Sequence, residues 1–291
     1  MVLRLVLYVK EELLREAEFV GRLKCSQYAV QCMENVAADE SLLRQQIAEA
    51  IEGRAAASEC LMLVTTEAQY RAADLLGMAT LPYTGAPSPQ APSFDGAWMV
   101  AEGLSEIDDD FLNKVYQRYH NLPWTILHTE RCCLRELSLE DMDALFELYA
   151  QEGITDYLEP LYNRDKEEAY ERSYIDCMYR YYGYGMWLVC DRNTGEIIGR
   201  AGLEHREYGE QTELEMGYLI TLKRQRMGYA TEVCRAIIDY AREYTDFSRI
   251  NCLIVPENTP SIRLVEKLGF QKWGRTDIAG QVMERYVLQL L

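Results

Sequence analysis

A glycine-containing turn between a strand and a helix is the segment of this sequence with the most specific chemistry. It runs from Gln225 to Ala230 (QRMGYA), after the strand-like run Glu213–Ile220 and before helical periodicity that extends to Glu243. Gly228 allows the backbone to approach a ligand closely. The unpaired N–H groups of the first helical turn, at the positive end of the helix dipole, favour an anion. The pattern predicts a pyrophosphate-binding turn, and a surface turn before a helix is the alternative.

Three carboxylates precede this turn and could remove a proton from an ammonium group, directly or through a water molecule. Glu213 and Glu215 are two residues apart and therefore lie on one face of the same strand. Glu204 lies on the preceding strand. The alternative for Glu215 is a structural hydrogen bond or salt bridge.

Downstream of the turn, the pattern predicts another strand and helix. The strand is Ile250–Val255, which ends at Pro256. Asn258, with a proline two residues later, begins the helix, and Gly269 ends it before the next strand begins at Phe270.

With these elements in place, residues 130–291 resemble the GNAT acetyltransferase superfamily, nearest the branch that includes ribosomal-protein alanine acetyltransferases. Five segments carry the resemblance in order: 129–136, 197–203, 213–220, 225–230 and 258–270. The resemblance implies an α/β (α+β) fold with a mixed, mostly antiparallel sheet that splays at its middle strand. A smaller α/β domain, residues 1–129, precedes it.

The resemblance implies acetyl-CoA as the acyl donor. Its pantetheine arm is expected against the backbone of β-strand residues and its pyrophosphate in the turn. The expected cofactor-binding residues are Leu219, Ile220, Thr221, Gln225, Arg226, Met227, Gly228, Tyr229, Ala230, Thr231, Asn258 and Ser261.

The implied reaction is direct transfer of acetyl, in a ternary complex, to a primary amine: a protein N-terminus or a small amine. Glu215 is the first choice as general base, because the related branch has a glutamate there; Glu213 and Ser261 are further catalytic candidates. Many members carry a tyrosine, as the acid for the thiolate, where this chain has Val265. Ser261, a water molecule or a tyrosine from elsewhere would have to replace it.

A tyrosine-rich segment is expected to face the acceptor. Residues 157–184 contain eight tyrosines, and Asp156 and Glu159 lie beside the first of them. Aromatic faces and carboxylates can hold an amine. Ordinary packing of helix faces is the alternative for most of the eight.

The N-terminal half shows strand–helix alternation typical of a parallel α/β unit. The expected elements are an apolar run at Leu3–Val9, helical periodicity over Glu11–Arg54, a strand at Cys60–Val64, a helix at Ala68–Leu76, an apolar stretch at Met78–Leu81, irregular structure over 82–96, a strand at Ala97–Val100 and a helix at Asp108–Tyr119.

Residues 59–78 resemble the core of haloacid-dehalogenase-like hydrolases. The turn Thr65–Glu67 replaces that family's Gly-Asp for Mg²⁺, and Leu7–Lys10 stands where its paired aspartates would be. Phosphoryl transfer then lacks a nucleophile and metal ligands. A catalytically dead unit with a scaffold, regulatory or dimerisation role is expected, and a phosphohydrolase is disfavoured.

Composition limits the partners. The 291 residues carry a net charge of −17 without a basic run, which argues against nucleic acid. Neither a signal peptide nor a membrane-length apolar stretch is present in the sequence. Nine scattered cysteines and three histidines show no metal-site spacing and indicate a cytoplasmic protein. A homodimer is a candidate assembly. The alternative to an enzyme is a non-catalytic CoA-binding regulatory protein.

Overall fold

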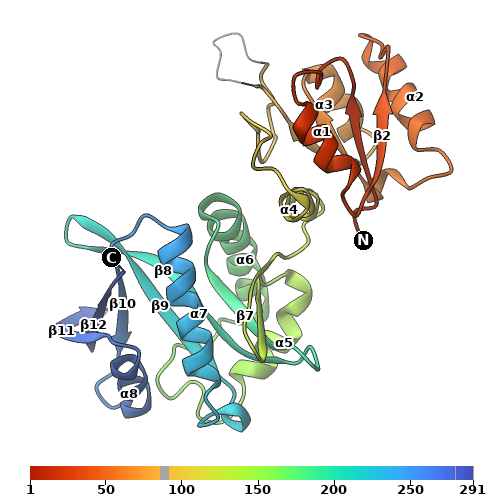
Figure 1. Cartoon of the computed structure of the whole chain (residues 1–291). Coiled ribbons are helices and arrows are strands. Elements are labelled where there is room, and N and C mark those ends of the chain that lie inside the picture. The colour runs from red at the N-terminus through yellow and green to blue at the C-terminus, as the bar shows by residue number, and fades with distance from the viewer. Residues whose placement is uncertain (86–91, 279, 291) are drawn as a thin grey trace. The chain divides into compact units, whose positions relative to one another are not determined.

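Two compact units make up the chain, Met1–Leu122 and Pro123–Leu291 (Figure 1). The structure is a computed structural model that describes residues 1–85, 92–278 and 280–290. The boundary expected near residue 129 falls after this division, because the strand Thr125–His128 already pairs with Cys132–Arg135 in the second unit. None of the helices that the structure describes has the length and apolar content needed to cross a bilayer.

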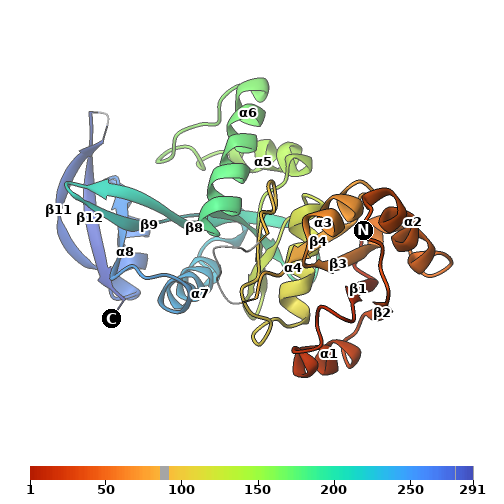
Figure 2. The same cartoon turned by 90° about the horizontal axis from the view of Figure 1, so that it is seen from above.

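The first unit is a four-stranded parallel sheet, in the order β2-β1-β3-β4, between two layers of helices. Alternation along β1 explains the layers: Val6 and Tyr8 pack with α1 and α4, whereas Leu5 and Leu7 pack with α2 and α3. Figure 2 shows α1 and α3 on opposite sides of this sheet. Its elements are β1 (Leu5–Val9), α1 (Ala17–Lys24), β2 (Ala29–Met33), α2 (Glu40–Ile51), η1 (Ala57–Glu59), β3 (Cys60–Val64), α3 (Glu67–Asp74), β4 (Ala79–Pro82) and α4 (Asp109–Tyr119).

Two expectations for this unit were wrong. The helical periodicity over 11–54 is interrupted by β2, which pairs in parallel with β1 from Ala29 to Met33. The strand expected at Ala97–Val100 is absent from the described residues, where only a single bridge joins Tyr83 to Ala101. Residues 86–91 of the expected irregular segment lie outside the described residues.

The second unit is an eight-stranded mixed sheet, in the order β11-β12-β10-β9-β8-β7-β6-β5. Its pairs are antiparallel except β9 with β10, which confirms the expected mostly antiparallel sheet. Its elements are β5 (Thr125–His128), β6 (Cys132–Arg135), η2 (Leu139–Asp141), α5 (Met142–Tyr149), α6 (Arg164–Tyr174), the π-helix η3 (Ile175–Tyr182), β7 (Met186–Asp191), β8 (Ile197–Tyr208), β9 (Gln211–Ile220), η4 (Leu222–Arg224), α7 (Tyr229–Tyr244), β10 (Arg249–Ile254), α8 (Thr259–Lys267), β11 (Gln271–Ile278) and β12 (Gln281–Gln289).

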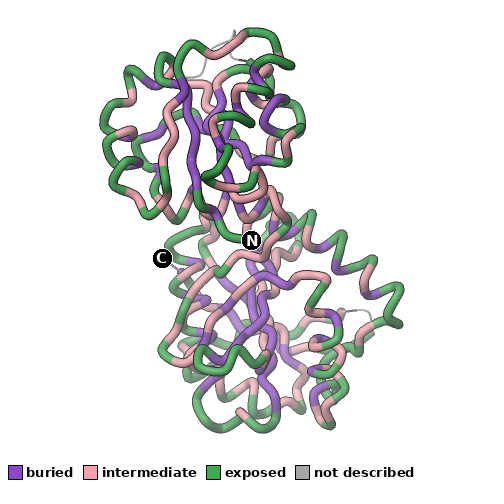
Figure 3. Tube along the Cα trace, turned by 90° about the vertical axis from the view of Figure 1, so that its right-hand side faces the viewer, coloured by how far each residue is buried: buried purple, intermediate pink, exposed green. Residues whose placement is uncertain are grey.

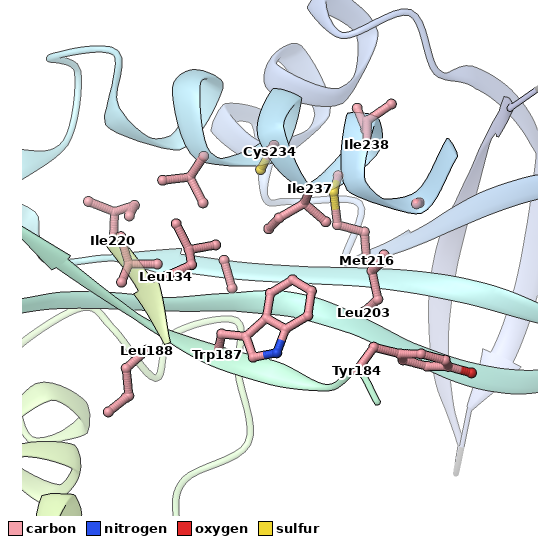
Figure 4. Packing of buried hydrophobic residues seen from close by; sticks show 14 of the residues in the cluster. Leu134, Tyr184, Trp187, Leu188, Leu203, Met216, Ile220, Cys234, Ile237 and Ile238 are labelled. Atoms are coloured by element: carbon pink, nitrogen blue, oxygen red, sulfur yellow. The ribbon is translucent and has the colours of Figure 1, made fainter. Parts of the chain in front are cut away.

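Helices cover both faces of this sheet, with α7 on one side and α5 and α6 on the other (Figure 2). Buried residues concentrate on the strands of each unit (Figure 3). Between the sheet and α7, Trp187 and Met216 pack beneath Ile237, and all three belong to the main core (Figure 4). Burial of this face fixes the register of β9 and therefore the direction in which each of its side chains points.

Candidate active site

The parallel pair β9–β10 separates soon after it begins. Among the described residues only two pairs join these strands, Leu214 with Ile250 and Glu215 with Asn251. In contrast, β9 stays paired with β8 as far as Ile220. Beyond Glu215, the edge of β9 that faces β10 therefore carries backbone groups without a strand partner. This opening confirms the splay expected from the sequence.

The turn between β9 and α7 has a fixed backbone. Gly228 has φ 86° and Arg226 has φ 59°, both in the left-handed region that favours glycine. Arg131 donates from Nη1 to the Met227 carbonyl at 3.0 Å and from Nε to the Glu232 carboxylate at 2.7 Å. Gly228 is the N-cap of α7 and offers no side-chain cap. The N–H groups of the first helical turn are therefore available to an anion.

A cavity of ≈ 540 Å³ joins this turn to the splay. Ten of the expected cofactor-binding residues line it: Leu219, Ile220, Gln225, Arg226, Gly228, Tyr229, Ala230, Thr231, Asn258 and Ser261. Thr221 and Met227 do not. The Thr221 N–H instead donates to the Ile198 carbonyl of β8 at 2.9 Å, and Met227 is 55% exposed.

Gln225 and Asn258 shape the cavity from two elements. Gln225 donates from Nε2 to the carbonyl of Ile220 at 3.0 Å, which ties the turn to the end of β9. Asn258 is the N-cap of α8, and its Oδ1 accepts the N–H of Ser261 at 3.2 Å. The side-chain oxygen Oδ1 of Asn258 therefore caps α8, and Nδ2 is the donor group of the same side chain.

Tyr218 also lines the cavity, although the sequence analysis did not select it. Its hydroxyl donates to the backbone carbonyl of Ser261 at 3.2 Å, and burial raises the pKa of this hydroxyl. Val265, at the position where a tyrosine is common in the resembled family, is fully buried. The sequence signal for Tyr218 is its place on β9 beside Leu219.

Arg263 and Lys267 are two further lining residues that the sequence analysis missed. Both residues follow Asn258 on α8. They are four residues apart, so their side chains lie on one face of the helix. The four-residue spacing can be read from the sequence, but the sequence does not show that the two side chains line a cavity.

Glu215 lies at the last pair of β9 and β10 before the splay. Its side chain is on the same face of β9 as Leu219, which packs towards α5. The carboxylate accepts hydrogen bonds from Arg206 and from the Tyr208 hydroxyl, the latter at 3.2 Å. Glu204 stands directly across on β8. Within the described part of the chain, no three Cys, His, Asp or Glu side chains are placed to hold a metal ion.

Glu213, the other glutamate of this strand face, is 6% exposed and has three partners. Its carboxylate accepts from Arg285 at 2.9 Å and from the Asn251 amide at 2.8 Å, and it lies 3.4 Å from the Arg249 guanidinium. Such a network fixes β9, β10 and β12 to one another. We propose a structural role for Glu213 on the ground of these partners.

Replacement of Glu213 by alanine is expected to lower the free energy of unfolding by about 3 kcal/mol, because Arg285 and Asn251 lose their buried partner. Urea unfolding followed by circular dichroism measures this. Glu243→Ala, at an exposed position of α7, is the matched control and should change stability by less than about 0.5 kcal/mol. Equal effects of the two substitutions would contradict the structural role.

The tyrosine-rich segment contributes less to the cavity than its composition suggested. Of its eight tyrosines, Tyr157 lines the cavity, next to Asp156. Tyr174 is buried and donates to the Glu204 carboxylate at 2.8 Å, whereas Tyr181 is 80% exposed. Packing therefore accounts for the placement of Tyr174. Within this segment, the cavity is lined by Tyr157, which lies in the connection between α5 and α6.

Comparisons with known proteins found the following similarities. Residues 131–271 match the family model described as an acetyltransferase (GNAT) domain. The uncharacterized protein YkkB of Bacillus subtilis is 31% identical over 161 residues, which cover 52% of this chain and 91% of that protein. The uncharacterized N-acetyltransferase p20 of Bacillus licheniformis is 29% identical over 170 residues, which cover 57% and 95%. A solved structure from Bordetella pertussis, named as a putative GnaT-family acetyltransferase, is 24% identical to this chain. The match covers 56% of this chain and 99% of that one, with a TM-score of 0.48.

Proposed function

The chain belongs to the GNAT acetyltransferase family, and we propose that residues 130–291 transfer the acetyl group of acetyl-CoA directly to a primary amine. The cavity carries the proposal, because it connects the turn at Gly228 with the open edge of β9. One ligand can therefore place a diphosphate at the start of α7 and a pantetheine arm along the strand. Direct transfer needs both substrates bound together and no covalent intermediate on the protein.

The donor is held mainly by backbone groups. The N–H groups of Tyr229, Ala230 and Thr231 bind the pyrophosphate at the positive end of α7. The open edge of β9 at Ile220 pairs with the amides of the pantetheine arm as an added strand would, and Asn258 donates from Nδ2. When bound, acetyl-CoA supplies the activated thioester.

Glu215 acts as the general base, removing a proton from the substrate ammonium directly or through one water molecule. Arg206 and Tyr208 hold its carboxylate in a defined orientation at the start of the splay. Glu204, across on β8, adds a second negative charge that favours a cationic substrate. Glu213 is already saturated by its own partners and does not take part.

The leaving thiolate needs a hydrogen-bond donor, and the Tyr218 hydroxyl provides it by turning its one proton from the Ser261 carbonyl to the sulfur. Tyr218→Phe is expected to lower kcat about a hundredfold, while the affinity for acetyl-CoA changes less than about threefold. Ser261→Ala is expected to have a smaller effect, because the hydrogen bonds of Ser261 in the structure use its backbone. Steady-state release of CoA thiol measures both variants. A larger loss in Ser261→Ala would reverse the assignment.

The acceptor is a protein N-terminus, as in the ribosomal-protein alanine acetyltransferase branch that the sequence resembles, or a small amine. Asp156 and Tyr157 line the cavity from the α5–α6 connection and favour an ammonium group through charge and cation–π contact. The net charge of −17 attracts amines as well.

The test is acetylation of defined amines by the full chain. The protein is incubated with acetyl-CoA and, separately, with a peptide that begins with alanine, with spermidine and with an aminoglycoside, and products are analysed by mass spectrometry. A peptide with a blocked N-terminus is the control. Acetyl on any free amine supports the proposal, and the peptide alone would support the ribosomal-protein branch. Binding of acetyl-CoA without any acetylated amine would contradict it.

We further propose that residues 1–129 are a non-catalytic relative of haloacid-dehalogenase-like hydrolases. At the carboxyl ends of β1 and β2, Lys10 pairs with Glu34. The Glu12 carboxylate accepts the Gln69 amide at 2.7 Å, so these polar side chains satisfy one another. The unit serves as a scaffold, a regulatory element or a homodimer interface. Phosphate release from a chromogenic ester by the full chain with Mg²⁺ should not exceed the buffer rate, and release proportional to protein would overturn this assignment.

The cytoplasm is the compartment that we propose for this protein. All nine cysteines are free thiols, including the exposed Cys25 and Cys177. Reduced thiols of this kind are typical of a reducing compartment.

A further inference from the structure

Positive side chains gather around the cavity even though the chain carries a net charge of −17. Arg226, Arg263 and Lys267 line it, and none of them has a carboxylate partner within the residues that the structure describes. Arg224 lines the same cavity but lies 3.2 Å from the Glu196 carboxylate, so its charge is already balanced. Three unbalanced cations at one cavity of an acidic protein indicate a ligand with several negative charges.

The cations come from two elements. Arg226 belongs to the turn before α7, where the helical N–H groups are also available. Arg263 and Lys267 stand one turn apart on α8, and Leu264 from the same stretch also lines the cavity. The cations therefore lie on two different elements that border one cavity.

A diphosphate at the start of α7 uses the cation of the turn, Arg226, and the pair on α8 is available to another anionic group. The pair on α8 remains, and a ligand that uses it must carry a second phosphate. CoA carries one, the monoester on its ribose 3′ oxygen, which holds nearly two negative charges at neutral pH.

We propose that Arg263 and Lys267 bind the 3′-phosphate of CoA, so that the protein selects CoA thioesters over those of 3′-dephospho-CoA. This inference rests on the proposed function. The Arg263 guanidinium can donate to two phosphate oxygens at once, and the Lys267 ammonium adds a compact charge. The subsite takes no part in the reaction and contributes only to donor recognition.

Calorimetric titration of the full chain with CoA and with 3′-dephospho-CoA tests the subsite. The wild type is expected to bind CoA about tenfold to a hundredfold more tightly, and this ratio should shrink as salt is raised. The double variant Arg263→Gln, Lys267→Gln should bind both ligands equally, at the affinity of the wild type for 3′-dephospho-CoA. Arg224→Gln, which removes a balanced cation, should keep the wild-type ratio.

The outcomes separate this inference from the function on which it rests. Equal affinity of the wild type for the two ligands would overturn the subsite while leaving the CoA site in place. A preference for CoA that survives in the double variant would also overturn it. Failure of both ligands to bind would instead overturn the proposed function, and the subsite with it.

Discussion

Substitution of Gly228 by tryptophan is expected to weaken binding of acetyl-CoA by at least about a hundredfold, which corresponds to roughly 2.7 kcal/mol. Gly228 has φ 86°, where any other residue pays about 1–2 kcal/mol. A Cβ there would lie 3.4 Å from Nη2 of Arg131, the side chain that holds the turn. The indole would also cover the N–H groups that bind the diphosphate. Calorimetry with acetyl-CoA measures the loss.

Gly209→Trp is the matched control for this substitution. Gly209 also has positive φ, 67°, and a Cβ there would meet nothing within 4 Å. It lies between β8 and β9, outside the cavity-lining residues. Its affinity for acetyl-CoA should stay within about twofold of the wild type. Similar affinities of the Gly228 and Gly209 variants would show that the turn does not bind the diphosphate.

Replacement of Glu215 by glutamine is expected to lower kcat by about 10²–10⁴, because the amide cannot accept the ammonium proton. The side chain keeps its size, and its oxygen still accepts from Arg206 or Tyr208, so folding should be preserved. Acetyl-CoA binding should be unchanged, since Glu215 does not line the cavity. Rates with the amine that the wild type acetylates best, measured across pH, test this.

Glu204→Gln supplies the comparison, because Glu204 faces Glu215 across the strand pair and is held by Tyr174. Its loss should raise KM for a cationic amine more than it lowers kcat. If Glu215→Gln retained the wild-type kcat while Glu204→Gln lost it, the base would be Glu204. If both retained it, neither glutamate would be the base.

The parts of the site that the sequence predicted depend on local rules. Gly228 was predicted because glycine lets the backbone of a strand-to-helix turn approach a ligand closely, and Asn258 and Gly269 because helix ends have preferred residues. Gly269 does have positive φ, 96°. The splay followed from a family resemblance whose motifs are spread over 130–291, not from any single strand.

The parts that were missed depend on contacts between distant residues. Glu213 meets Arg285, 72 positions away, and no sequence window contains both. Tyr218 reaches Ser261 only because β9 and α8 border the same opening. Within the first unit, β2 has only five residues and lies between two helices, so the helical periodicity on either side dominates the pattern there.

Amine-dependent turnover of acetyl-CoA by the full-length protein tests the central claim most directly. The release of CoA thiol is followed with acetyl-CoA alone and then with saturating primary amine, at the same protein concentration. A rate that rises with amine and saturates, accompanied by an acetylated product, is the predicted result. Acetyl-CoA binding with a thiol-release rate that no amine raises above hydrolysis would contradict acetyl transfer and favour a CoA-binding regulatory protein.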